Sequence, residues 1–127
     1  MRIALLLALA CAVAACLVPA TRASAAPENR CGWVVNPAPG NWWLTDRDGD
    51  WILATQGSDR EALGMENIGD ISAGDYRAVN GNYGYACGCM EVETEKKDGM
   101  QFITAVYSFR QLKLAQCERD KSLPKME

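Results

Sequence analysis

The sequence contains no histidine among its 127 residues, and this absence removes several kinds of site. Ser-His-Asp and Cys-His catalytic arrangements and histidine-ligated metals all need an imidazole. Basic residues are also scarce, since 13 Lys and Arg stand against 16 Asp and Glu. Nucleic-acid phosphates are bound by clustered Lys and Arg, so we expect no nucleic-acid partner.

Long apolar runs are missing except at the N-terminus. Residues 3–18 are almost wholly apolar, and Pro19 ends the run. These 16 residues fall short of the roughly 20 that span a bilayer as a helix, so we expect no membrane span. Small residues at positions 23–25 suit a signal peptidase. The pattern predicts a cleaved signal peptide over residues 1–25 and a single exported domain over residues 26–127, either periplasmic or secreted.

An alternative interpretation places the processing site earlier. The small residues Val13, Ala14 and Ala15 precede Cys16 at the end of the apolar run, as in a bacterial lipobox. In that case Cys16 is lipidated and the chain becomes a membrane-anchored lipoprotein. Both interpretations export the chain, so its remaining cysteines meet an environment where disulfides persist.

Four cysteines remain in the predicted mature domain: Cys31, Cys87, Cys89 and Cys117. Alternate residues of a strand lie roughly 6.5–7 Å apart, at the limit for a disulfide, so a Cys87–Cys89 bond is disfavoured. Two pairings stay open: Cys31–Cys87 with Cys89–Cys117, or Cys31–Cys89 with Cys87–Cys117. Structural zinc usually takes close pairs spaced C-x2–4-C, which the C-x-C pair here does not match, so we expect no metal.

Short apolar runs broken by 11 Gly and 5 Pro are typical of a β-rich chain. Strands are predicted over residues 32–35, 41–45, 50–55, 75–79, 82–95 and 100–114, with residues 36–40 as a loop. Residues 56–74 are predicted as a long loop with one short helical turn, at the capping-box spacing of Ser58 and Glu61. The expected fold is mainly β, a small antiparallel meander of barrel-like or sandwich form held by two disulfides.

The first hairpin assigns side chains to faces. A two-residue type I′ turn at Asp48-Gly49 places Leu44 opposite Leu53. The predicted core face is then shared by Trp42, Leu44, Trp51 and Leu53. Trp43 falls on the other face, where an exposed indole ring would offer a stacking surface to a ligand. A second turn is predicted at Asn80-Gly81 and a third over residues 96–99.

Several motifs together resemble one bacterial family. They are Cys31-Gly32-Trp33, Asn36-Pro37, residues 41–49, Asn80-Gly81, Tyr83-Gly84-Tyr85, the Cys87 and Cys89 pair, and Cys117 before Leu123-Pro124. This pattern is similar to that of domain of unknown function 4087 (DUF4087), a family of small exported proteins with no assigned activity. The resemblance implies an exported, cysteine-bearing single domain, and it supplies no catalytic residues.

The alternating acids Asp46, Asp48 and Asp50 invite a calcium or a catalytic interpretation. An EF-hand loop needs Gly at its sixth position and Glu at its twelfth, and Trp51 and Gly57 stand there instead. Paired carboxylates also serve glycoside hydrolysis, but they need a cleft that desolvates one of them. A small carboxylate-dependent hydrolase is therefore one alternative function.

A binding function is the main prediction. The candidate surface combines Trp43 and the three hairpin acids with an acidic strand that includes Glu91 and Glu93. We predict a non-enzymatic module that recognises an envelope protein or glycan, with no catalytic residue, cofactor or metal. A structural envelope lipoprotein is a further alternative.

Overall fold

The computed structural model describes residues 16–19 and 26–127, and six strands dominate the second range. They are β1 (Glu28–Ala38), β2 (Asn41–Asp46), β3 (Gly49–Ala54), β4 (Tyr76–Asn80), β5 (Tyr83–Lys97) and β6 (Met100–Leu112). The 3₁₀ turns η1 (Met65–Asn67) and η2 (Ile71–Ala73) precede β4, and the helix α1 (Leu114–Arg119) follows β6. The predicted mainly β fold is confirmed.

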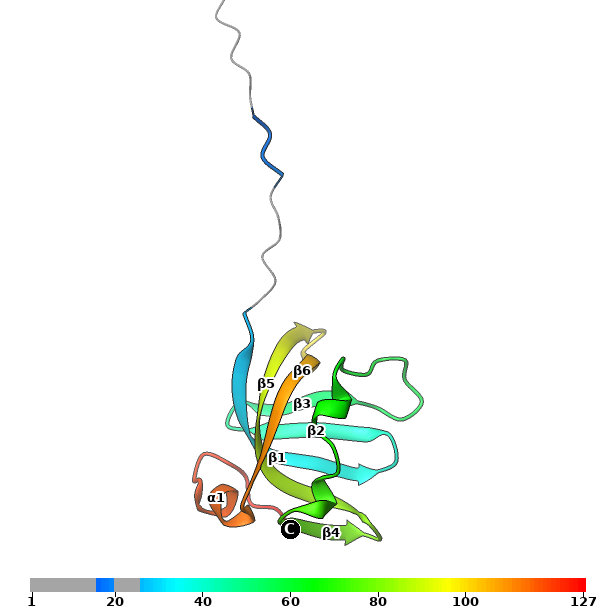
Figure 1. Ribbon diagram of the computed structural model, residues 1–127, viewed down its shortest axis with the longest axis vertical. Helices are drawn as coiled ribbons and strands as arrows, with labels where there is room; N and C mark the ends of the chain where they lie inside the picture. The colour runs from blue at the N-terminus through cyan, green and yellow to red at the C-terminus, as the bar shows by residue number, and fades with distance from the viewer. Residues whose placement is uncertain (1–15, 20–25) are drawn as a thin grey trace, which may run out of the picture.

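Five of the strands close into a barrel (Figure 1). Hydrogen-bonded neighbours follow the order β1-β2-β3-β6-β5, and β1 pairs again with β5 to complete the ring. Neighbours run antiparallel except β3 and β6, which meet in parallel at Ile52 and Phe102. The short β4 pairs with the beginning of β5, outside the ring. With β4 set aside, this order and these directions are those of the OB-fold, a five-stranded Greek-key barrel.

Two apolar clusters form on opposite sides of the barrel wall. The interior core contains Val34, Leu44, Trp51, Leu53, Ala62, Ile68, Ile71, Ala86, Met90, Val92, Ile103 and Val106. The second cluster, here called the outer cluster, contains Trp33, Val35, Tyr85, Cys87 and Cys117. Leu114 of α1 and two residues of the tail that follows it, Leu123 and Met126, pack against the outer cluster. Residues 113–127 thus cover part of the barrel's outer face.

The β2–β3 hairpin confirms the predicted faces and corrects the predicted register. Leu44 lies opposite Trp51, not Leu53, because the turn consists of residues 47 and 48. A type I′ turn at Asp48-Gly49 needs a positive φ at both residues, and only Gly49, at 108°, has one. The Asp46 carboxylate instead accepts a hydrogen bond from the Asp48 N–H at 2.8 Å, which fixes the bend one residue earlier.

Of the next two predicted turns, one is shifted by one position and the other lies where it was expected. Asn80 pairs with Tyr83, so the β4–β5 turn consists of residues 81 and 82, one position later than predicted. The positive φ of 59° at Gly81, the first turn position, is typical of a type II′ turn. The turn between β5 and β6 lies within the predicted range, and Asp98 and Gly99 have φ values of 53° and 76°. Two consecutive positive values match a type I′ turn.

Strand β1 is longer than predicted at both ends. It begins at residue 28, four residues before the predicted strand, and it continues through Pro37, where a loop was expected. Pro37 lacks an N–H, but it sits at a break in the β1–β2 ladder between Val35 and Ala38. A strand tolerates proline at such a bulge because no ladder hydrogen bond is required there.

Two further local predictions were wrong. The loop after β3 forms two 3₁₀ turns, and neither lies at Ser58, whose hydroxyl accepts from the Arg60 N–H while Glu61 bridges to Ala54. The predicted last strand extended to residue 114, but β6 ends at Leu112 and α1 begins at Leu114. A helix of six residues carries too little periodicity to be seen in the sequence.

The disulfides select one of the two open pairings. Cys31 bonds to Cys89, and Cys87 bonds to Cys117. Cys16 is exposed and is the free cysteine of the described residues. The predicted signal peptide otherwise lies outside the described residues, as do Val13, Ala14 and Ala15 of the lipobox. Within residues 16–19 and 26–127, no helix has the length and apolar character needed to cross a membrane.

Candidate functional site

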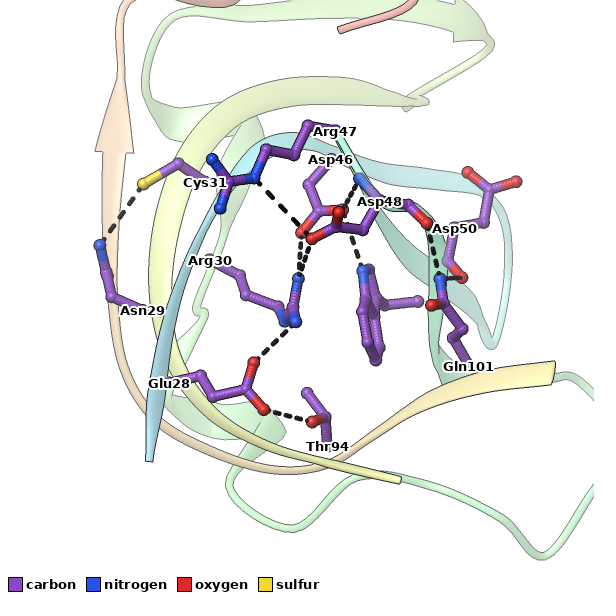
Figure 2. Close-up of polar contacts among 11 residues, drawn as sticks. Glu28, Asn29, Arg30, Cys31, Asp46, Arg47, Asp48, Asp50, Thr94 and Gln101 are labelled. Carbon is purple, nitrogen blue, oxygen red and sulfur yellow. Dashed lines mark hydrogen bonds and ion pairs between the residues drawn. The ribbon is translucent and has the colours of Figure 1, made fainter. Parts of the chain in front are cut away.

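Arg30 of β1 gathers three carboxylates around the β2–β3 turn (Figure 2). Its Nη1 donates to Asp46 Oδ2 at 2.8 Å and to Asp48 Oδ2 at 3.1 Å, and its Nη2 lies 2.7 Å from Glu28 Oε2. The guanidinium also stacks 3.8 Å from the centroid of the Trp51 ring. Only 15% of the Arg30 side chain is exposed, so these ion pairs form in surroundings that screen charge less than water does.

Asp46 lies beneath the surface on which we predicted it. Its side chain is 5% exposed, and both oxygens are occupied. Oδ1 accepts from the Trp51 indole at 3.0 Å and from the Asp48 N–H, while Oδ2 accepts from Arg30. A carboxylate whose two oxygens accept three hydrogen bonds is held in one orientation. The geometry therefore gives Asp46 a structural role in holding the hairpin against β1.

Of the other two predicted acids of the hairpin, Asp48 shares Arg30 with Asp46, whereas Asp50 is engaged by Thr45. Asp48 is half exposed, and Arg47 Nε lies 3.8 Å from its carboxylate. Asp50 accepts a hydrogen bond from the Thr45 hydroxyl at 2.6 Å. The three acids do not converge on a common point, and no group of three potential metal-ligating side chains occurs in the part of the chain that the structure describes.

The electrostatics of this cluster stabilise its ionised form. Burial opposes the charge on Arg30, but the hydrogen bonds to Asp46 and Asp48 outweigh it and raise the pKa of the guanidinium. A hydrogen bond from the Thr94 hydroxyl, and then the charge of Arg30, lower the pKa of Glu28. Arg30 Nε is buried and has no hydrogen-bond partner among residues 16–19 and 26–127.

Replacing Thr94 with Val is expected to raise the pKa of Glu28 towards its ordinary value, because a 2.6 Å hydrogen bond to the carboxylate is lost. A lowered folded-state pKa contributes stability above the ordinary carboxyl range, and that contribution disappears as the pH falls through the folded-state pKa. The variant should therefore lose less stability on acidification across this window. NMR titration of Glu28 measures the shift, with Thr104→Val as the control because its hydroxyl contacts a backbone carbonyl instead. An unchanged Glu28 pKa in Thr94→Val would contradict the assignment.

Trp43 lies on the outer face of the barrel, as predicted, but its ring is half-buried. It packs against the outer cluster, in which the rings of Trp33 and Tyr85 meet edge to face with centroids 5.3 Å apart. Trp43 lies opposite Val35 on the neighbouring strand, and Val35 in turn lies opposite Tyr85. The indole of Trp43 is therefore the partly exposed margin of an aromatic surface.

A pocket of about 400 Å³ opens between the outer cluster and the C-terminal tail. It is lined by Trp33, Tyr85, Cys117, Glu118, Asp120, Lys121, Leu123, Pro124, Lys125 and Met126. The indole of Trp33 donates to the Pro124 carbonyl at 2.9 Å, which holds the tail as one wall of the pocket. Two of the lining residues are lysines and two are acids, so the pocket offers polar groups of both signs around buried aromatic side chains.

The acidic strand is partly compensated. Glu91 is exposed, whereas Glu95 forms an ion pair with Arg60 at 3.3 Å. Glu93 accepts a hydrogen bond from the Tyr107 hydroxyl, and this contact raises the pKa of Tyr107. Of the three acids Glu91, Glu93 and Glu95 on β5, two therefore already have partners.

The sequence of this barrel matches one known protein family. Residues 25–124 match the family described as "Protein of unknown function (DUF4087)". The chain belongs to the DUF4087 family. No curated protein and no solved structure matches it. The predicted resemblance is thus confirmed over nearly the whole described barrel, and the two disulfides of this DUF4087 chain suggest an oxidising environment of the kind exported proteins meet.

Sequence reasoning missed several residues of this DUF4087 chain. Arg30 and Glu28 precede the first predicted strand, and no motif marks them. Trp33 and Tyr85 belong to two of the motifs that carry the family resemblance, but their pocket depends on the C-terminal tail folding back across the barrel. The hydrogen bond between Trp33 and Pro124 joins residues 91 positions apart, and a local pattern carries no signal for it.

Proposed function

We propose that this DUF4087 chain is an exported, non-enzymatic binding module that recognises a glycan or protein of the cell envelope. The observation that carries the proposal is the 400 Å³ pocket between the outer cluster and the C-terminal tail. Ligand sites are typically concave, mostly apolar and equipped with a few polar groups, within roughly 300–1,000 Å³. Charged groups of both signs at the pocket, together with the partly exposed Leu123 and Met126, suit a ligand that is polar on one side and apolar on the other.

The position of the pocket on a rigid wall supports this function. Cys87 lies on β5 and Cys117 on α1, so their bond fixes the helix that precedes the tail. A binding site held in one conformation loses less entropy when it takes up its ligand.

The non-enzymatic part of the proposal rests on the carboxylates. Asp46 and Asp50 are engaged by Arg30, Trp51 and Thr45, and a hydrolytic acid needs a free carboxyl with a raised pKa. The pKa of Glu28, in the same cluster, is lowered. Export is proposed from the signal-like N-terminus together with the disulfides. Lipidation at Cys16 would place the same module on a membrane surface.

The test measures binding of soluble peptidoglycan fragments, and of purified envelope proteins, by calorimetry. Lys121 and Lys125 line the pocket, and both are exposed. Changing both to Ala should retain the fold and weaken binding about tenfold. The matched control is Lys97→Ala, on an exposed residue of the β5–β6 hairpin away from the pocket. Trp43→Ala extends the test to the margin of the aromatic surface, and saturable binding that neither pocket nor Trp43 variants alter would refute the proposal.

A further inference from the structure

The two disulfides lie next to each other on the outer face of β5 but differ in exposure. Cys31 is exposed at the surface, and its partner Cys89 is 7% exposed. Cys87 and Cys117 are 1% and 4% exposed, so the second bond is buried at both ends. An attacking thiolate reaches a disulfide only along an open approach, so the Cys31–Cys89 bond is the accessible one.

The two bonds also differ in what they hold together. Cys31 and Cys89 face each other on β1 and β5, within a ladder that runs from Glu28 opposite Val92 to Asn36 opposite Gly84. Opening their bond removes no hydrogen bond of that ladder, so the folded barrel keeps its closure. Cys87–Cys117, in contrast, cross-links α1 to β5.

The surroundings of the exposed bond suit a leaving thiolate. A hollow of about 300 Å³ is lined by all four bonded cysteines and by two charged side chains, the cation Arg110 and the carboxylate Asp120. Arg110 lies directly opposite Cys89 on β6 and forms no ion pair within residues 16–19 and 26–127. A nearby guanidinium lowers the pKa of a thiol and so favours its departure as thiolate. On the other side, the Asn29 amide lies 3.6 Å from Cys31 Sγ and donates to it (Figure 2).

We propose that Cys31–Cys89 is a thiol–disulfide exchange site whose substrate class is a dithiol. A substrate thiolate attacks Cys31 Sγ, the Cys31–Cys89 bond breaks, and Cys89 leaves as a thiolate beside Arg110. The second substrate thiolate then attacks the substrate sulfur of the mixed disulfide, which releases Cys31 as a thiolate. The chain gains two electrons, the dithiol becomes a disulfide, and protons from solvent complete the two new thiols. This proposal does not depend on the pocket or on its ligand.

The experiment exposes the oxidised protein to dithiothreitol, quenches samples with an alkylating reagent and maps the labelled cysteines by mass spectrometry. Cys31 and Cys89 should be labelled on the order of tenfold faster than Cys87 and Cys117. The far-UV circular dichroism should stay unchanged while the first bond opens. Equal rates for the two bonds, or loss of the β signal with the first, would overturn the proposal.

A second arm tests the direction of attack with one equivalent of glutathione, whose single thiol cannot resolve its own mixed disulfide, so that the adduct can be trapped by alkylation. The adduct should form on Cys31 and leave Cys89 free. Arg110→Gln should slow its formation on the order of threefold, Arg110→Lys should restore the rate, and Arg77→Gln on β4 serves as the exposed control. An adduct on Cys89, or identical rates for Arg110→Gln and Arg110→Lys, would contradict the assigned roles.

Discussion

Replacing Asp46 with Ala is expected to lower the free energy of unfolding by about 3–5 kcal/mol, because the substitution breaks a buried ion pair at one end only. Arg30, with 15% of its side chain exposed, would keep its charge and lose its closest partner on the hairpin. The Trp51 indole and the Asp48 N–H would lose their acceptor as well. Urea denaturation of the variant and the wild type measures the difference.

Asp48→Ala is the matched control for this prediction. Asp48 contacts the same Arg30 Nη1 at 3.1 Å, but half of its side chain is exposed, so its loss should cost less than about 1 kcal/mol. Equal losses from the two variants would mean that burial does not govern the cluster. The structural role given to Asp46 would then have to be abandoned.

The faces of the first hairpin could be predicted although its register could not. The predicted turn at Asp48-Gly49 and the observed turn at residues 47 and 48 differ by one position. Moving a two-residue turn by one position moves each residue's partner by two, and two is the period of side chains along a strand. Leu44 and Trp51 therefore stay in the core under either register. The sequence pattern did not show that the Asp46 carboxylate would accept a hydrogen bond from the Asp48 N–H. This bond, and not the positive φ of Gly49, sets the position of the turn.

The candidate site was less accessible to prediction because its contacts join distant segments. Arg30 reaches Asp46 only after β1 and β2 have paired, and nothing near Arg30 in the sequence marks it as buried. The pocket needs α1 and the tail to cross the outer face of β1 and β5, although α1 has too few residues to show an amphipathic period. The cysteine count predicted two bonds, but choosing the partner of Cys87 required the positions of β1 and α1 in space.

Changing both Cys87 and Cys117 to Ser is expected to cost about 3.5 kcal/mol, the chain-entropy value for a bond that closes a loop of 30 residues. The local effect should be more specific than the global one. Helices as short as α1 are not stable alone in water, so α1 depends on its anchorage to β5. Without the bond, the tail should leave Trp33, and the hydrogen bond from the indole to Pro124 should be lost. Tryptophan fluorescence should shift to the red, and amide exchange over residues 114–119 should accelerate.

The double change of Cys31 and Cys89 to Ser provides the comparison that separates these effects. Its loop of 58 residues predicts a loss of about 4 kcal/mol, slightly more than that of the other pair. The β1–β5 ladder would nevertheless continue to hold the folded barrel, so the exchange rates of residues 114–119 should stay near those of the wild type. The two bonds would then contribute similarly to the free energy of unfolding, while only Cys87–Cys117 holds the wall of the pocket in place. Equal acceleration of amide exchange over residues 114–119 in both variants would contradict this prediction. It would mean that the order of α1 depends on the stability of the whole barrel and not on Cys87–Cys117.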